Sequence, residues 1–273
     1  MRVNVSASEV RVRTVPAASN PPGKLIDNPI GVMFSGGMDS TLTAAVLADR
    51  FRNIHLVTYG MGRQLQFMSN ALYHVHELKK ILGEDRIHHE FVDNNEIFSE
   101  LKKGFIRDYV EYCNNKAPFI HCLKCKFSMH ARSIIYCLEN GLKYWADGAI
   151  EAQNDRPEMM PGVLKLLEGL YAQYGIELSS PVYYYGSRDD ERRELVRRGY
   201  TLGLQTGDLH KTVQPLCLYG IMYAYWHYSA TPSEKDVVRF AESKLPLASK
   251  LIRQYFERKG HMPKAVARVP MES

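Results

Sequence analysis

An apolar run, two glycines and a short turn rich in hydroxyl groups follow one another near the start of the chain. The run IGVMF (30–34) predicts a buried strand, and MDSTLTAAVLADRF (38–51) carries its apolar residues at helical spacing. Between them, Gly36 and Gly37 let the backbone turn sharply and approach a ligand closely. The segment therefore predicts a strand, a tight turn and a helix, the arrangement in which a helix N-terminus binds an anion.

The alternation of strand and helix patterns continues along the chain. Further strands are expected at 53–60, 87–93, 143–150 and 176–185, and helices at 65–83, 95–113, 122–141, 162–175, 188–200 and 233–259, the last broken at Pro246. Strands that alternate with helices predict a parallel α/β sheet, with ligands at the carboxyl ends of its strands. We expect an N-terminal arm (1–28), a nucleotide-binding α/β domain (29–220) and a helical C-terminal extension (221–273). The extension is expected to pack beside the sheet or to form an oligomer contact, such as that of a homodimer.

Composition narrows the classes of protein that fit this chain. No apolar run approaches the roughly 18 residues needed to span a membrane, and the first residues lack the apolar core of a secretory signal. We therefore expect a cytoplasmic protein with no membrane partner. The net charge of +5 permits an anionic ligand or RNA without favouring either.

The stretch SGGMDS (35–40) has the chemistry of a phosphate-binding turn. Ser35 and Ser40 add hydroxyl donors to the amide groups of the helix N-terminus. The stretch lacks the lysine of GxxxxGK[ST], and it does not follow GxGxxG. The plain alternative is a strand-to-helix turn capped by Asp39 or Ser40.

SGGMDS resembles the SGGxDS signature of the PP-loop ATP pyrophosphatases, whose fold is the parallel-sheet, HUP-like nucleotide-binding fold. The resemblance implies that the chain binds ATP and Mg²⁺ and splits ATP between its α and β phosphates, adenylating a substrate oxygen that a nucleophile then displaces. It implies phosphate contacts for Ser35, Gly36, Gly37, Asp39 and Ser40, with catalytic roles for Asp39 and Ser40. It also implies that adenine lies near Met33 and Tyr59, and that Gly148 lines the nucleotide.

Three of the five cysteines have a spacing that suits a metal. Cys122 and Cys125 form a C-x-x-C pair, and Cys217 lies far along the chain. Three thiolates suit a [4Fe–4S] cluster with one open iron, or a zinc ion with one open position, and a redox pair is a third reading. The alternative is a buried structural pair with an unrelated Cys217. Cys113 and Cys137 have no partner spacing, and the odd count argues against a disulfide framework.

The order and approximate spacing of these cysteines resemble the tRNA 2-thiocytidine synthetases of the same superfamily. That resemblance implies a cluster held by Cys122, Cys125 and Cys217, with a catalytic role for Cys217. It also implies a free iron that carries sulfur, a tRNA substrate and a sulfur donor. The sequence ADGAIEAQND (146–155) departs from the histidine-rich GHHxDD that those enzymes have after the fourth strand.

A second resemblance lies at 154–182, where NDRPEMM and the helix and strand after it look like 7-cyano-7-deazaguanine synthases. That reading implies a small-molecule substrate, an amine or ammonia as nucleophile and a zinc ion. The zinc cysteines of those enzymes follow the late cysteine, and nothing after Cys217 supplies them.

Acidic residues follow the fourth strand at Asp147, Glu151, Asp155 and Glu158. They could hold Mg²⁺ on the phosphates or form a solvated loop. The charged run RDDERRELVRR (188–198) predicts an exposed helix face, and its arginines could instead meet RNA phosphates.

The sequence thus favours an ATP-dependent adenylating enzyme that replaces an oxygen by sulfur in tRNA or a small molecule. The alternatives are a zinc-containing ligase that uses nitrogen, and a regulatory protein that binds a nucleotide without turnover.

Overall fold

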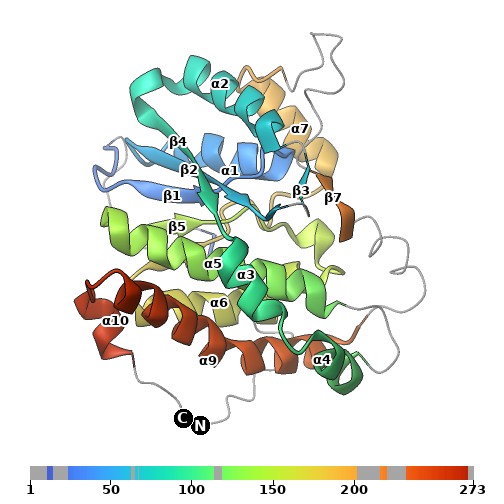
Figure 1. Cartoon of the computed structure of the whole chain (residues 1–273). Coiled ribbons are helices and arrows are strands. Elements are labelled where there is room, and N and C mark those ends of the chain that lie inside the picture. Colours follow the sequence, from blue (N-terminus) through green and yellow to red (C-terminus); the bar gives the residue numbers. More distant parts are fainter. Residues whose placement is uncertain are drawn as a thin grey trace.

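The computed structural model describes residues 11–14, 24–62, 65–66, 68–113, 119–201, 216–219 and 232–269. Its centre is a five-stranded parallel sheet in the order β4-β2-β1-β5-β6 (Figure 1). The strands are β1 (Ile30–Met33), β2 (Ile54–Gly60), β4 (Ile87–Asp93), β5 (Tyr144–Ala146) and β6 (Glu177–Ser179). A short antiparallel ladder joins β3 (Leu65–Gln66) to β7 (Leu216–Cys217). The predicted parallel α/β fold is confirmed.

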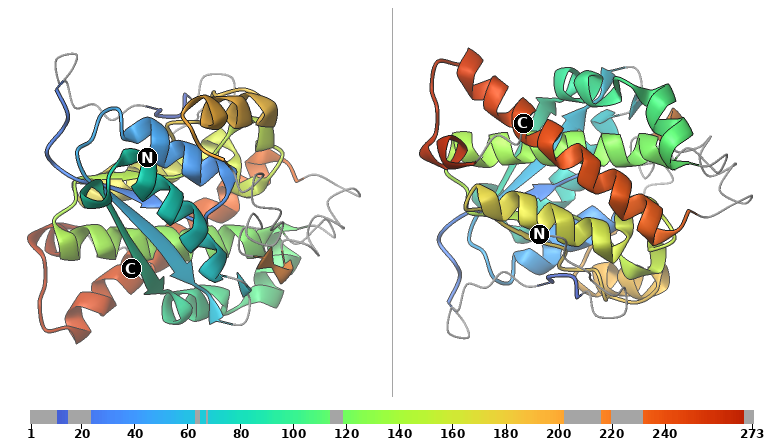
Figure 2. Two further views of the ribbon diagram at one scale, coloured as in Figure 1. Left: turned by 90° about the horizontal axis from the view of Figure 1, so that it is seen from above. Right: turned by 90° about the horizontal axis from the view of Figure 1, so that it is seen from below.

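Helices cover both faces of the sheet. The helices are α1 (Met38–Leu47), α2 (Ala71–Leu82), α3 (Asn95–Lys102), α4 (Phe105–Tyr112), α5 (Ile120–Asn140), α6 (Pro161–Gln173), α7 (Arg188–Arg197), α9 (Glu234–Arg258) and α10 (Lys264–Arg268). Short 3₁₀ turns lie at Met68–Asn70, Glu84–Arg86, Glu151–Gln153 and Pro157–Met159. Figure 1 shows α1, α2 and α7 on one face of the sheet, and α3, α5 and α6 on the other. On this second face α9 crosses over α5 and α6 as an outer layer (Figure 2).

The core divides along the same two faces because neighbouring residues of a strand point to opposite sides. Ile54 and Leu56 of β2 pack in the cluster under α1 and α2, whereas Val57 and Tyr59 pack in the cluster under α5. Both faces of β2 are therefore buried, as expected for an inner strand of a parallel sheet that helices enclose.

The strand order reverses between β1 and β5. From β1 the chain builds outward through β2 to β4, and it then returns to place β5 and β6 on the other side of β1. Ligands of open α/β sheets bind at such a reversal, beyond the carboxyl ends of the strands. The SGGMDS turn after β1 and Asp147 after β5 both lie at this point.

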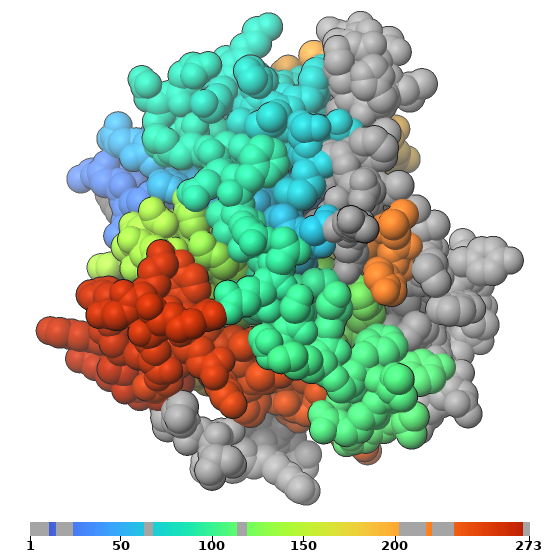
Figure 3. Space-filling view, in the orientation of Figure 1, coloured from blue at the N-terminus to red at the C-terminus, as the bar shows by residue number. Residues whose placement is uncertain are grey.

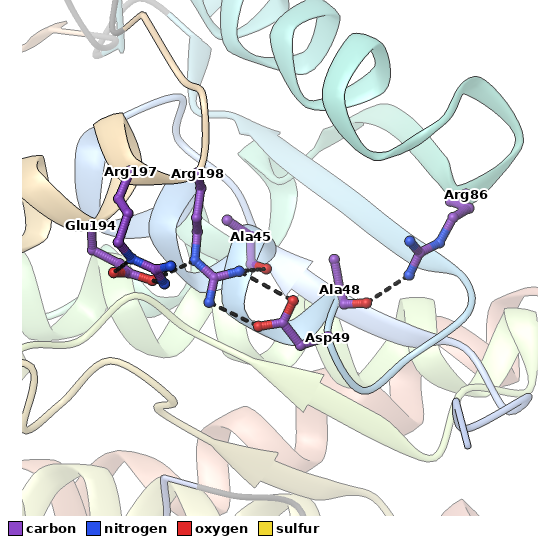
Figure 4. A network of polar contacts seen from close by, with 7 residues as sticks. All are labelled: Ala45, Ala48, Asp49, Arg86, Glu194, Arg197 and Arg198. Carbon is purple, nitrogen blue, oxygen red and sulfur yellow. Dashed lines mark hydrogen bonds and ion pairs between the residues drawn. The ribbon is translucent and has the colours of Figure 1, made fainter. Parts of the chain in front are cut away.

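Ion pairs and hydrogen bonds fix α7 beside α1 (Figure 4). The guanidinium group of Arg198 donates to both carboxylate oxygens of Asp49, at 3.2 and 2.8 Å, and to the carbonyl of Ala45 at 3.1 Å. Its Nε donates to Glu194 at 2.7 Å. The carboxyl end of α7 is thereby held against the carboxyl end of α1.

Several predicted boundaries are wrong for identifiable reasons. The helix expected at 95–113 is divided into α3 and α4, because Gly104 takes a left-handed φ of 68°. The break expected at Pro246 is absent: α9 runs unbroken from Glu234 to Arg258, packed against α5 and α6. Tertiary contacts therefore outweigh the hydrogen bond that proline removes.

The strand expected at 176–185 ends at Ser179, shortly before Pro181. The stretch expected to be helical from 65 begins with β3, and α2 starts only at Ala71.

Much of the predicted N-terminal arm, and the boundary expected between 220 and 221, lie outside the described residues. Within the arm, Arg13 accepts a hydrogen bond from the amide of Ser180 at 2.7 Å, and Ile26 bridges to Phe51. In the part of the chain that the structure describes, none of the helices is long and apolar enough to cross a membrane.

Candidate functional site

The turn after β1 has the geometry of an anion-binding loop. Gly36 has a φ of 73°, and a Cβ there would stand 2.6 Å from the Cα of Ala71. Both the backbone conformation and the lack of space therefore require glycine at this position. Gly37 is the N-cap residue of α1 and gives that helix no side-chain cap. The first amide groups of α1 are therefore left for a ligand.

The two predicted serines close the turn on itself. The amide of Gly37 donates to the hydroxyl oxygen of Ser35 at 3.2 Å, and the Ser40 hydroxyl donates to the carbonyl of Gly37 at 3.0 Å. The two hydroxyl oxygens are 3.3 Å apart. Both hydroxyl groups thus lie at the amide-lined turn, where they can turn from each other toward a phosphate. These hydroxyl and amide donors suit a phosphate group.

Gly148 lies against the first turn of α1. A Cβ on Gly148 would come within 3.1 Å of the amide nitrogen of Ser40 and 3.2 Å of the carbonyl carbon of Asp39. The loop after β5 therefore packs on the SGGMDS turn through backbone alone. This close approach brings together the two segments that the sequence assigned to the nucleotide.

Tyr59 and Met33 end the neighbouring strands β2 and β1. The ring of Tyr59 is buried against α5, where its hydroxyl is 2.5 Å from that of Ser133. Burial raises the pKa of Tyr59 well above its ordinary value. Tyr59 is thus a core residue, whereas Met33 is only half-buried, and the adenine contact expected at both stays a prediction.

A buried charged cluster, formed by Lys126, His130, Asp147 and Ser180, lies at the ends of β5 and β6. One carboxylate oxygen of Asp147 accepts from Lys126 at 3.0 Å, and the other accepts from Ser180 at 2.6 Å. His130 Nε2 lies 3.7 Å from the first of these oxygens. Burial alone would raise the pKa of Asp147, but Lys126, His130 and the Ser180 hydroxyl outweigh it and lower that pKa. Asp147 is therefore an anion, fully engaged by its neighbours.

The sequence had not marked Lys126 or Ser180. Ser180 comes directly after β6, so its place at the end of a predicted strand was a usable signal. Lys126 follows Cys125 inside α5, and nothing in the sequence distinguishes it from an exposed lysine.

The predicted metal cysteines lie near one another. Burial raises the pKa values of Cys122 and Cys125, and the nearby Glu158 and Cys217 raise both of them further. Cys217 reaches this place through the ladder of β7 with β3. Cys113 and Cys137, which were not expected to bind metal, are buried in the core.

These thiols do not form a metal centre as they stand. Among the described residues, no three side chains of His, Cys, Asp or Glu are grouped so that they could hold a metal ion. The three cysteines are thus neighbours without the geometry of metal ligands.

The acidic loop does not offer Mg²⁺ a ready site either. Asp147 is occupied by its own cluster, Glu151 and Asp155 are exposed, and Glu158 faces the thiols. The structure instead places Glu191 of α7 against Asp39, a contact that the sequence did not indicate.

A separate groove lies on the outer face. It has a volume of about 470 Å³ between α3 and α9, and it is lined by Glu96, Ile97, Glu100, Leu251, Gln254, Glu257 and Arg258. Figure 3 shows this face, where α9 and α10 lie beside α3 and α4. None of the lining residues belongs to the SGGMDS turn or to the cysteines.

Comparisons with known proteins agree with this geometry. The family model of asparagine synthase matches residues 25–127, which include β1, the SGGMDS turn and the start of α5. A search among curated proteins found no match. Among solved structures, a 4-thiouridine synthetase in complex with RNA and bound ATP is similar at a TM-score of 0.56 and 14% identity, over 84% of this chain and 53% of that one. The chain thus spans about half the length of that enzyme.

Two further structures are more distant. The U34-tRNA thiolase NcsA from Methanococcus maripaludis, with its [4Fe–4S] cluster, has a TM-score of 0.41 and 14% identity, over 82% of this chain and 74% of that one. A predicted subunit of tRNA methyltransferase from Methanocaldococcus jannaschii has a TM-score of 0.39 and 16% identity, over 90% of this chain and 94% of that one.

The fold, the glycine turn between β1 and α1, and the match to the family model agree with one another. Residues 25–127 are therefore similar to the asparagine synthase family, and the fold is similar to that of the 4-thiouridine synthetase.

Proposed function

We propose that this protein is an adenylating enzyme that uses ATP to activate a substrate oxygen for replacement, with sulfur as the incoming atom and tRNA as the substrate. The observation that carries the proposal is the uncapped N-terminus of α1, which follows a glycine turn at the reversal of strand order. The similarity in fold to an ATP-bound 4-thiouridine synthetase in complex with RNA supports ATP and RNA as ligands.

The proposed reaction has two steps, adenylation of the substrate oxygen and displacement of AMP. A substrate oxygen attacks the α-phosphorus, the bond from that phosphorus to the bridging oxygen breaks, and pyrophosphate leaves. A hydrosulfide then adds to the activated carbon, and AMP departs with the original oxygen. The turn of Ser35, Gly36, Gly37 and Ser40 would hold the leaving pyrophosphate, since amide groups aimed at developing negative charge stabilise it.

Lys126 is the buried cation of the charged cluster at the end of β5. Its ion-pair partner Asp147 is followed directly in the chain by Gly148, which packs on the first turn of α1. The pair would therefore fix the loop that borders the nucleotide. Mg²⁺ would neutralise the phosphate charge.

Cys122, Cys125 and Cys217 are proposed as the sulfur-handling group, on the observation that they lie together with Glu158. A metal centre at these thiols, whether [4Fe–4S] or zinc, would require the side chains to move closer together than they stand. The same activation with ammonia as nucleophile would make the protein a ligase.

The test measures AMP released from α-labelled ATP, with unmodified tRNA transcripts as acceptor and with sulfide or ammonium as nucleophile. We expect AMP and pyrophosphate in equal amounts, and thiolated RNA in the sulfide arm. Asp39→Ala should abolish AMP formation, and Asp85→Ala, which changes an exposed carboxylate, should leave it at the parental rate.

Each contrary outcome rejects a defined part of the proposal. ATP binding without AMP in any arm would indicate a non-catalytic nucleotide-binding protein. Product only with ammonium would replace sulfur by nitrogen, and parental activity in Asp39→Ala would overturn the assignment of the turn.

A further inference from the structure

β4 is an edge strand of the central sheet. In the part of the chain that the structure describes, β2 is the one strand that pairs with it (Figure 1). A hollow of about 280 Å³ lies beside β4, and its lining includes residues 90–93, Arg132 and Tyr255. Residues 90–93 are consecutive, so their side chains point alternately to the two faces of the sheet. All four can line one hollow only because the edge of the strand opens into it.

The pairing of β4 with β2 identifies the backbone groups that face outward. The amide of Asn94 donates to the carbonyl of Gly60 at 3.0 Å. Because backbone groups alternate in direction along a strand, the even-numbered residues of β4 face β2 and the odd-numbered ones face away from it. Ile87, His89 and Phe91 therefore present their amide and carbonyl groups at the open edge.

β4 lacks the features that usually keep an edge strand from pairing. Its sequence, IHHEFVD, contains no lysine and no proline, and the strand runs over seven residues without a break. Phe91 is a large apolar side chain that is 43% exposed. Edge strands that stay unpaired are commonly short, or they carry lysine, proline or a bulge. The edge of β4 is therefore available to a further strand.

The sequence of β4 is complementary to a second copy of itself in one antiparallel register. In this register His89 lies opposite His89 of the second copy, across a two-fold axis. Phe91 then lies opposite Ile87, which belongs to the apolar cluster under α2. On the other face of the sheet, the exposed His88 lies opposite the exposed Glu90, so that an imidazole meets a carboxylate. The outward backbone groups fall into pairs that can each exchange two hydrogen bonds.

Other antiparallel registers fit this strand less well. A shift by one residue would pair side chains from opposite faces of the sheet. An axis centred on Glu90 would set two carboxylates against each other. An axis centred on His88 would leave Phe91 opposite residue 85, which lies before β4 begins. Charge and hydrophobicity thus match together when the axis passes through His89.

We propose that two copies of this chain associate through their β4 strands, antiparallel and centred on His89, to form one continuous sheet. Strands paired in this way run in opposite directions, so the carboxyl ends of the two sheets face opposite ways. The two SGGMDS turns therefore lie on opposite sides of the dimer. This association is independent of the proposed function, because it requires neither ATP nor turnover.

Sedimentation equilibrium of the full chain in a reducing buffer measures the association. We expect a reversible dimer of the parent protein. Phe91→Lys should raise the dissociation constant of the dimer at least tenfold, since lysine on an edge strand opposes pairing. Ile106→Lys is the matched control, because Ile106 is an apolar side chain of α4 that is 79% exposed, and this variant should associate like the parent.

An exchange of the two polar residues tests the register. His88→Glu would set carboxylates against each other in both copies of the pair, and it should weaken the dimer about fivefold. Adding Glu90→His to that variant restores an imidazole opposite a carboxylate, so the dissociation constant should return to within about twofold of the parent. Weakening without this recovery would reject the register centred on His89.

A disulfide bond locates the contact. His89→Cys places two thiols in a hydrogen-bonded pair, where the Cα atoms are about 5.5 Å apart and a disulfide can span them. After oxidation with glutathione disulfide, mass spectrometry should find position 89 linked to itself. Asp189→Cys is the control, because Asp189 lies on α7 beside α1 with its side chain 77% exposed, and it should give no such link.

Each contrary result has a defined meaning. A parent that stays monomeric up to its solubility limit rejects pairing through β4, and so does a dimer that Phe91→Lys leaves intact. Loss of the dimer in Ile106→Lys alone would assign the contact to α4. Should circular dichroism show Phe91→Lys unfolded, the His89→Cys variant decides, and absence of its disulfide rejects the proposal. The AMP assay tests the proposed function separately, since none of these measurements involves a nucleotide.

Discussion

Asp108 is a single buried carboxylate that serves two buried lysines. Its Oδ2 lies 2.7 Å from the Nζ of Lys124 on α5 and 2.7 Å from the Nζ of Lys244 on α9. All three side chains are less than a tenth exposed. The triad joins α4, α5 and α9 and carries a net positive charge, so its anion and its cations are not equivalent.

Asp108→Asn should therefore be far more damaging than the loss of one lysine. It leaves two buried cations without an anion, for which a cost of about 3–5 kcal/mol is expected. The rings of Phe105 and Phe240, which lie 5.6 and 5.0 Å from the two ammonium groups, retain part of the stabilisation. For a chain of this size the loss corresponds to a fall in melting temperature of about 6–20 °C.

Lys124→Met is the matched comparison. It leaves Asp108 paired with the buried Lys244 and, at 3.6 Å, with the exposed Arg107. The thioether fills the space of the lysine stem, so stability should stay within about 1 kcal/mol of the parent. Equilibrium unfolding in urea, followed by circular dichroism, measures both changes. Equal costs for the two variants, or a cost below about 1 kcal/mol for Asp108→Asn, would refute the charge argument.

The same triad predicts how stability depends on acid. Burial alone would raise the pKa of Asp108, but its hydrogen bonds and ion pairs with Lys124 and Lys244 outweigh burial and hold the pKa below 3.8. The stabilisation is thus complete above that pH and is lost as the pH falls through the lowered value. Asp108→Asn should lose this part of the decrease in stability at low pH. If its stability falls with pH as steeply as that of the parent, the proposed contribution of the ion pairs is refuted.

Two further predictions concern the site. Gly148→Ala should lower ATP affinity about tenfold, or about 1.4 kcal/mol, with little change in stability, because its Cβ would stand 3.1 Å from the amide of Ser40. Equilibrium dialysis checks this, with Gly169→Ala as the control, since nothing lies within 4 Å of a Cβ there; parental affinity in Gly148→Ala would show that the contact is dispensable. Metal analysis of anaerobically prepared Cys→Ala variants should show loss at positions 122, 125 and 217 and retention at Cys113 and Cys137. Equal loss in all five, or loss in none, would reject the three-thiol centre.

The sequence predicted the sheet because short apolar runs such as that of β1 alternate with helical patterns and end at turn residues. It predicted the SGGMDS turn because few backbones need two glycines between a strand and a helix. It could not predict that Pro246 stays inside α9, since that depends on packing against α5 and α6.

The burial of Glu191 could not be predicted either, because it too depends on tertiary packing. It lies in a run of charges whose pattern predicts an exposed face, and α7 does expose Asp189 and Arg193 while it buries Glu191 completely. Lys126 was hidden in the same way, because burial of a single charge is decided by partners far away in the sequence.

The contacts of Arg198 that hold α7 against α1 also determine when the site can form during folding. Arg198 and Ala45, which are joined by a hydrogen bond, are 153 residues apart in the chain. Contacts that close so long a loop form late in folding, and during synthesis they must wait for the downstream segment to emerge. A nascent chain that ends within α5 already holds the SGGMDS turn but lacks Gly148, Glu191 and the helix that carries Glu191. Nucleotide binding should thus appear only after β6 and α7 have been made, which makes ATP a ligand that reports completion of the domain.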